Sequence, residues 1–202
     1  MRKKKNPKSF AVMACLLLPW LSSCAGSSRI GTEPDAAQQF LTALNAHCGK
    51  AYAGRIVVNE PASDDDPFAD KALIMHVRDC GSDEMRVPFH VGDDHSRTWV
   101  LSRLATGLQL KHDHRHQDGS QDVLTWYGGT STTPGSAQRQ AFPADQESRA
   151  LFEREKIPVS VDNVWAMEIN ERTFIYELAR PNRLFRVEFD LGQAVALPPP
   201  TW

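Results

Sequence analysis

The sequence MRVPFHV, Met85 to Val91, has the clearest strand pattern in the chain. Met85, Val87, Phe89 and Val91 alternate with polar or less apolar residues, and this period of two is typical of a β-strand with one buried face. Similar short runs lie on both sides of it, near residues 52–58, 73–77, 99–101, 108–116, 121–127, 164–169, 174–178 and 185–191. Short strands at near-regular spacing favour an antiparallel barrel or sandwich over a sheet of βαβ units.

Two helices accompany the strands. Thr32-Glu33-Pro34-Asp35 combines a hydroxyl cap, an early proline and acidic residues, and Phe40 and Leu44 follow at helical spacing before Gly49, which predicts an N-terminal helix. Residues 145–156 predict one short additional helix. We therefore expect a mainly β fold, an antiparallel barrel or sandwich, similar in pattern to lipocalin-like and fatty-acid-binding-like folds.

The turn residues predict how the runs are connected. Asp118-Gly119 lies between residues 108–116 and 121–127, which indicates a hairpin. The Gly-, Ser- and Thr-rich residues 128–135 predict a loop. Residues 32–193 are then a single β-rich domain, and the Pro-rich residues 194–202 are a tail extended along its surface.

The first 23 residues resemble a bacterial lipoprotein signal peptide. They begin with basic residues, and the apolar stretch 10–21 is too short to span a bilayer as a helix. Leu21-Ser22-Ser23-Cys24 resembles a lipobox, which implies cleavage before Cys24 and lipidation of its thiol. The following Ala25 favours an outer-membrane location, on the periplasmic face or the cell surface. Residues 24–31 are expected to be a flexible tether.

Removal of the signal peptide changes the charge balance. It takes away five basic residues and no acidic ones, leaving 18 basic and 25 acidic residues and a formal charge of −7. An acidic chain is a poor match for phosphate backbones, so we do not expect nucleic acid as a partner. The expected membrane contact is the lipid on Cys24.

Cys48 and Cys80 remain once Cys24 carries lipid. In an oxidising compartment this pair predicts a disulfide. Two buried free thiols, or two metal ligands, are the alternatives, although the wide separation and the lack of a CxxC motif do not favour a zinc site.

The most unusual stretch is HDHRH, residues 112–116. On a strand, His112, His114 and His116 share one face with Leu108 and Leu110. The three imidazoles are therefore expected to line one end of a barrel interior or a cleft.

Two of these histidines could share a zinc or copper ion, because imidazoles at i and i+2 on a strand lie close together. A third ligand would then come from a neighbouring strand, with His90, His76 and Asp122 as candidates. The alternative is a polar histidine network at a cavity mouth.

Several segments together resemble an uncharacterised family of secreted or lipid-anchored proteobacterial proteins: 96–101, 110–116, 127–129, 142–145 and 185–189. The resemblance implies a single exported domain and assigns no catalytic residue. The sequence contains no GxSxG or HExxH motif, and we assign no catalytic residue either.

Three functions stay open on the sequence alone. The first is a non-enzymatic module that binds a small or lipidic ligand near His112, His114 and His116. The second is a metal-binding protein or a zinc-dependent hydrolase. The third is an envelope protein that interacts with other envelope components through its surface.

Overall fold

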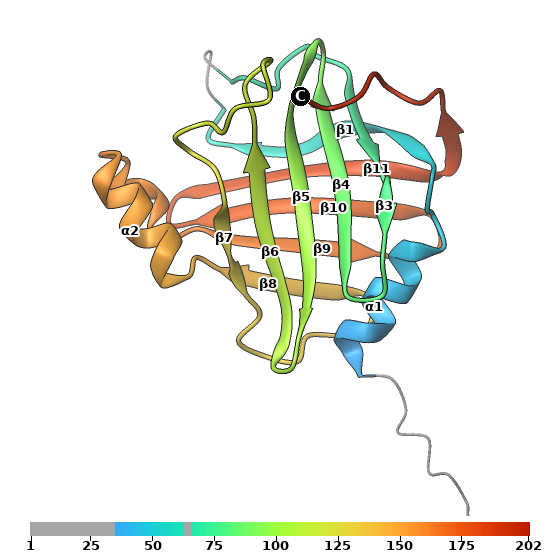
Figure 1. Ribbon diagram of the computed structural model, residues 1–202, viewed down its shortest axis with the longest axis horizontal. Coiled ribbons are helices and arrows are strands. Elements are labelled where there is room, and N and C mark those ends of the chain that lie inside the picture. Colours follow the sequence, from blue (N-terminus) through green and yellow to red (C-terminus); the bar gives the residue numbers. More distant parts are fainter. Residues whose placement is uncertain (1–34, 63–65) are drawn as a thin grey trace, which may run out of the picture. The chain divides into compact units, whose positions relative to one another are not determined.

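A computed structural model describes residues 35–62 and 66–202 (Figure 1). The predicted signal peptide, lipobox and tether, and with them Cys24, lie outside the described residues. The elements are α1 (Ala36–Asn45), β1 (Ala51–Glu60), β2 (Leu73–His76), β3 (Asp79–Cys80), β4 (Glu84–Val91), β5 (Asp94–Leu104), β6 (Gly107–His114), β7 (Tyr127–Thr130), β8 (Arg139–Pro143), α2 (Gln146–Arg154), the 3₁₀ turn η1 (Pro158–Ser160), β9 (Val164–Ile169), β10 (Thr173–Arg180) and β11 (Arg183–Val195).

The strands form a nearly closed antiparallel barrel, which confirms the predicted mainly β fold. They pair in the order β7-β6-β5-β4-β2-β1-β11-β10-β9-β8. The short strand β3 lies outside this order and pairs with β4. Strands that are neighbours in the sequence therefore mostly lie side by side around the barrel, and the first strand, β1, pairs with the last, β11. In Figure 1 the strands β4–β6 run across the strands β9–β11, so the barrel has two crossing walls.

The seam of the barrel lies between β7 and β8, where a single bridge joins Gly129 to Ala144. A Cβ on Gly129 would lie 1.8 Å from the carbonyl oxygen of Pro143, and one on Gly128 would lie 1.9 Å from that of Leu110. Only glycine permits this approach. The loop predicted from residue 128 onward was therefore wrong for its first part, because these glycines give close backbone packing instead of flexibility.

The predicted hairpin beyond β6 forms only in part. Gly119 lies in a turn and Tyr127 begins β7, which pairs with β6, but residues 121–126 make no ladder apart from one bridge between Arg115 and Gln121. Local bonds replace the missing partner: Asp122 Oδ1 accepts from the amide of Leu124 at 2.8 Å. Short polar side chains often compete with strand pairing in this way.

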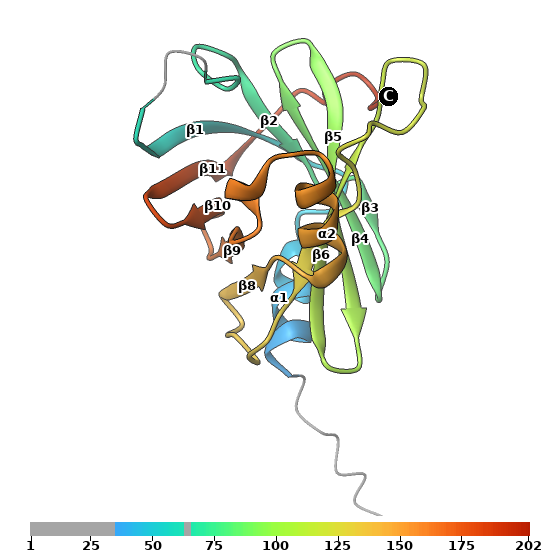
Figure 2. The same ribbon diagram turned by 90° about the vertical axis from the view of Figure 1, so that its left-hand side faces the viewer.

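Helix α1 closes one end of the barrel. Its buried residues Phe40, Leu41 and Leu44 belong to the same apolar cluster as the barrel interior, and Figure 2 shows α1 at the lower end, between the two walls. The helix begins after Asp35, whose Oδ1 caps the amide of Gln38 at 2.9 Å; Thr32, the expected hydroxyl cap, lies outside the described residues.

The predicted disulfide joins Cys48 to Cys80, with a Cα–Cα distance of 6.1 Å. It ties the segment after α1 to β3, at the edge of β4.

The C-terminal tail lies against the outside of the barrel. Ala194 and Val195 still pair with β1, and beyond them Thr201 accepts a bond from Arg78 at 2.7 Å while the amide of Trp202 donates to the carbonyl of His95 at 3.3 Å. The tail is therefore fastened at its end.

Within residues 35–62 and 66–202, no helix is long and apolar enough to cross a membrane. The core residues of the described part of the chain lie in the unit from Glu33 to Trp202. We therefore expect a chain that begins at Ala25 to fold on its own.

Candidate functional site

The interior of the barrel is filled by aromatic rings. The Trp99 ring stacks on Phe89 at 4.8 Å and on Tyr176 at 4.5 Å between centroids, and Phe174 and Phe189 contact the same group. A solid centre of this kind leaves space for a ligand only near an end.

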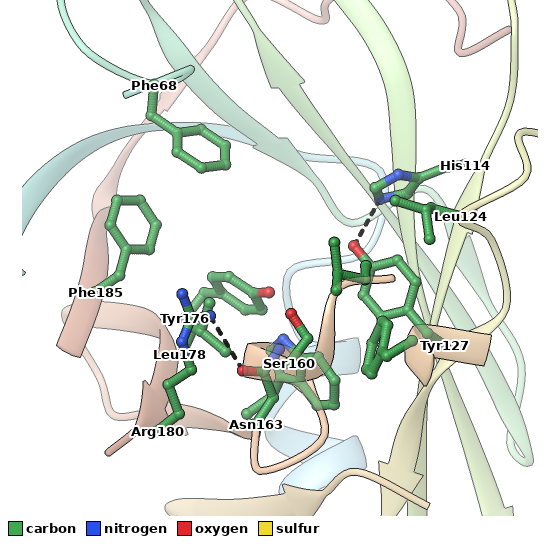
Figure 3. Close-up of a pocket in the computed structure, with 13 residues that line it drawn as sticks. Phe68, His114, Leu124, Tyr127, Ser160, Asn163, Tyr176, Leu178, Arg180 and Phe185 are labelled. Carbon is green, nitrogen blue, oxygen red and sulfur yellow. Dashed lines mark hydrogen bonds between the residues drawn. The ribbon is translucent and has the colours of Figure 1, made fainter. Parts of the chain in front are cut away.

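A hollow of about 280 Å³ lies at one end of the barrel (Figure 3). We call it the mouth hollow. Its aromatic lining consists of Phe68, Tyr127, Phe152, Trp165, Tyr176 and Phe185. These rings come from the loop after β1, from β7, α2, β9, β10 and β11, so the hollow exists only once the barrel has closed. Ligand sites are commonly apolar concavities of this kind at the mouths of barrels.

Phe68 and Phe185 form the aromatic rim opposite the histidine. Their ring centroids are 4.9 Å apart, and Figure 3 shows both rings on the side of the hollow away from His114. The guanidinium of Arg97 lies over the Phe68 ring, 5.7 Å from its centroid. This contact holds in place a phenylalanine that lies outside regular secondary structure.

Two lining residues, Tyr127 and Tyr176, hydrogen-bond to the buried His112, which does not itself line the hollow. Nδ1 of His112 donates to the carbonyl of Tyr127 at 3.1 Å, and Nε2 lies 2.9 Å from the hydroxyl of Tyr176. The imidazole also stacks on the Tyr127 ring at 4.7 Å. Burial lowers the pKa of His112 to about 3, so the ring is neutral at neutral pH. With its one proton on Nδ1, Nε2 accepts from Tyr176.

His114 stands on the wall of the hollow. Its Nε2 lies 3.3 Å from the hydroxyl of Tyr127, a contact drawn in Figure 3. Burial and the nearby Arg97 lower the pKa of His114 to about 4. Burial also raises the pKa of the Tyr127 hydroxyl above its ordinary value. Both groups are therefore neutral hydrogen-bonding groups at neutral pH.

The structure brings together only two of the predicted site histidines. His112 and His114 face inward, as their parity with Leu108 and Leu110 predicted. His116 lies past the end of β6 and is exposed. The strand ends at His114, so the alternation that placed His116 on the same face no longer applies.

His90 lies on the outside of the barrel. The inward positions of β4 are Met85, Val87, Phe89 and Val91, so His90 faces the C-terminal tail, and its Nδ1 lies 2.8 Å from Nδ1 of His95. It therefore cannot join His112 and His114 around one ion. Among the residues that the structure describes, no three His, Cys, Asp or Glu side chains are grouped so as to hold a metal ion.

The charged group of the mouth hollow is Arg180, at the end of β10. Its Nη1 donates to Oδ1 of Asn163 at 3.2 Å, and Ser160 also lines the hollow. Burial and the nearby Arg183 lower the pKa of Arg180, but a guanidinium stays charged at neutral pH.

Sequence reasoning missed this polar wall. Ser160, Asn163 and Arg180 come from η1, its exit and β10, and no short motif connects them. The aromatic residues Tyr127, Trp165 and Tyr176 are buried or partly buried, and they also line the hollow. The arrangement offers stacking faces, neutral hydrogen-bonding groups and one cation, all of which are binding groups.

No family model, curated protein or solved structure matches the chain. The function must therefore be argued from the geometry of the mouth hollow.

Proposed function

We propose that this protein is a lipid-anchored binding module of the cell envelope that holds a small, mainly apolar molecule in the mouth hollow. The observation that carries the proposal is the contrast between the two ends of the barrel. One end is closed by α1 and the centre is filled by stacked rings, whereas the other end keeps a hollow lined by six aromatic side chains.

The volume of the mouth hollow limits the size of the ligand. Sites for drug-sized molecules range from roughly 300 to 1,000 Å³, and the mouth hollow, at about 280 Å³, is at the lower end of this range. A compact molecule of one or two rings fits this size, whereas a whole phospholipid does not. Of the small and lipidic ligands considered from the sequence, the geometry favours the small one.

The polar groups are suited to orienting such a molecule. His114 and the Tyr127 hydroxyl lie on one side of the hollow, Asn163 and Arg180 lie on the other, and Ser160 lies between them in Figure 3. A few fixed polar groups around an apolar lining are what small-ligand sites use for orientation. The metal and surface-interaction alternatives have less support: the described residues show no metal-ligand cluster, and their large exposed apolar residues, Val123, Val159 and Leu197, come from three separate segments.

Binding is tested with the neutral fluorescent probe N-phenyl-1-naphthylamine and soluble protein beginning at Ala25. We expect a saturable rise in probe fluorescence. Ser160→Trp places an indole in the hollow and should abolish the rise. Val159→Trp is the matched control, because Val159 is adjacent, 63% exposed and not part of the lining. No saturable binding to the unmodified protein, or equal binding by both variants, would contradict the proposal.

The location in the envelope is supported by the sequence of residues 1–25, and it needs its own test. In a Gram-negative host, we expect the protein to fractionate with the outer membrane and to carry acyl chains on Cys24. Two or three acyl chains hold a protein firmly at a bilayer, whereas one chain binds reversibly. Cys24→Ala should remove the acyl chains from residue 24 and the protein from the outer-membrane fraction. Mass spectrometry of the purified protein that shows an unacylated Cys24 would contradict the lipid anchor.

A further inference from the structure

The mouth hollow has one charged side chain among its described lining residues, and that side chain lacks a carboxylate partner within the described part of the chain. Arg180 bonds to the neutral amide of Asn163. Nine other arginines of the described residues form ion pairs with Asp or Glu. Arg180 is therefore a charged group kept without an opposite charge in an acidic protein.

The surroundings of Arg180 add a second positive charge. Arg183 follows it across the β10–β11 turn, bonds to the carbonyls of Glu60 and Leu184, and lies over the Phe185 ring at 5.4 Å. Both arginines also line two further hollows that share Arg180 with the mouth hollow and that Asp162 and Asp66 line as well. Two cations in one corner repel each other, and a bound anion would offset that repulsion.

We infer that the ligand of the mouth hollow is a compact anionic amphiphile, with an apolar ring body between the aromatic walls and one negatively charged group at Arg180. This inference rests on the proposed function. A carboxylate, a sulfonate or a phosphate has the planar or forked oxygens that a guanidinium binds through two hydrogen bonds. Asn163 holds the guanidinium in position, and Ser160 offers a further hydroxyl in the lining.

The rest of the hollow suits the uncharged part of such a molecule. His114 and Tyr127 on the far wall are both neutral at neutral pH, so they neither repel an apolar body nor compete with Arg180 for the anion. The rings of Phe68, Trp165 and Phe185 provide apolar faces. Charge at one wall and rings at the others define one orientation for the ligand.

Two fluorescent probes that share one skeleton separate the charge from the body. N-phenyl-1-naphthylamine is neutral, and 8-anilino-1-naphthalenesulfonate carries the same two aromatic groups with one sulfonate. We expect Arg180→Gln to weaken binding of the sulfonate by at least about tenfold, the loss typical of a charge-assisted bond, and to change binding of the neutral probe by less than about twofold. Arg180→Lys should recover part of the loss.

Arg172→Gln removes the same charge at the other end of β10, where the side chain is exposed, and should leave both probes unaffected. Equal effects of Arg180→Gln on the two probes, or an effect of Arg172→Gln as large on the sulfonate, would overturn the inference while saturable binding of the neutral probe leaves the proposed function standing. If neither probe binds the unmodified protein, both proposals fail. Melting temperatures of the variants show whether each is folded.

The chemical identity of the anionic group is distinguished by competition. Naphthalene-1-carboxylate, 1-naphthyl phosphate and uncharged naphthalene are added against the bound sulfonate probe. We expect displacement by at least one of the two anions, and weaker displacement of the probe by naphthalene. Equal displacement by all three compounds would contradict recognition of charge at Arg180.

Discussion

The hydroxyl of Tyr176 lies 2.9 Å from Nε2 of His112, and this bond joins the two walls of the barrel beneath the mouth hollow. Tyr176 belongs to β10 and His112 to β6, and the two residues are separated by 64 positions in the sequence. Because Nδ1 of His112 is committed to the carbonyl of Tyr127, the tyrosine is the donor. Tyr176, which lines the hollow, is thus held by a hydrogen bond between strands that are distant in the sequence.

We predict that Tyr176→Phe lowers the free energy of unfolding by about 1–3 kcal/mol, because it leaves Nε2 of the 3% exposed His112 without a donor. Urea unfolding measures the change. The double variant His112→Phe with Tyr176→Phe should cost less than the sum of the two single variants, since no buried polar atom is then stranded. Additive losses would show that the bond does not couple the two residues.

Stability should fall as the pH drops from about 6.5 towards 4. Burial lowers the pKa of His112 to about 3 and that of His114 to about 4, from an ordinary value of 6.5. In this window the unfolded chain binds protons that the folded chain does not, so acid favours unfolding by up to about 1.4 kcal/mol per pH unit for each such proton. Urea unfolding between pH 7 and 4.5 gives the slope.

Two variants test whether the buried histidines cause this dependence of stability on pH. His114→Gln should flatten the pH dependence, whereas His116→Gln should leave it unchanged, because His116 is exposed past the end of β6. His90 is a further contributor of the same sign, since burial and the adjacent His95 lower its pKa to about 4. A flat profile in the unmodified protein, or equal flattening by both variants, would be evidence against the buried histidines as the cause.

Closure of the barrel should depend on the absence of a side chain at Gly129. We predict that Gly129→Ala destabilises the fold by about 3 kcal/mol or more, because its Cβ would lie 1.8 Å from the carbonyl oxygen of Pro143 and backbone must move. Gly192→Ala is the matched control: its nearest neighbour is the end of the Asp190 side chain, at 3.0 Å. Comparable thermal stability of the two variants would contradict the account of the seam.

The sequence predicted the wall strands well and the seam poorly, for a physical reason. Apolar residues alternate with polar or less apolar ones in 85–91 and 185–191 because one face of each strand packs inward. The alternation therefore indicates directly which residues are buried. At the seam the requirement is backbone contact, which selects glycine at 128 and 129, and glycine also signals loops. The period-two pattern could not distinguish a glycine in a close backbone contact from a glycine in a loop.

Only the part of the candidate site that follows the alternation of a strand was predicted. His112 and His114 were found because they continue an apolar face of β6. Arg180 and Asn163 were not, because their role depends on which strand ends meet when the barrel closes. The histidines were weighed as metal ligands, and the structure instead shows His112 held between two tyrosines beneath an aromatic hollow.

The most direct test of the proposed function is the indole region of a ¹H–¹⁵N spectrum of soluble protein beginning at Ala25, recorded during titration with N-phenyl-1-naphthylamine. Trp165 lines the mouth hollow, whereas Trp202 lies with the tail against His95 on the outside of the barrel. We predict a saturable shift of the Trp165 resonance with no shift of Trp202. An unchanged Trp165 resonance, or equal shifts of both, would contradict binding in the hollow.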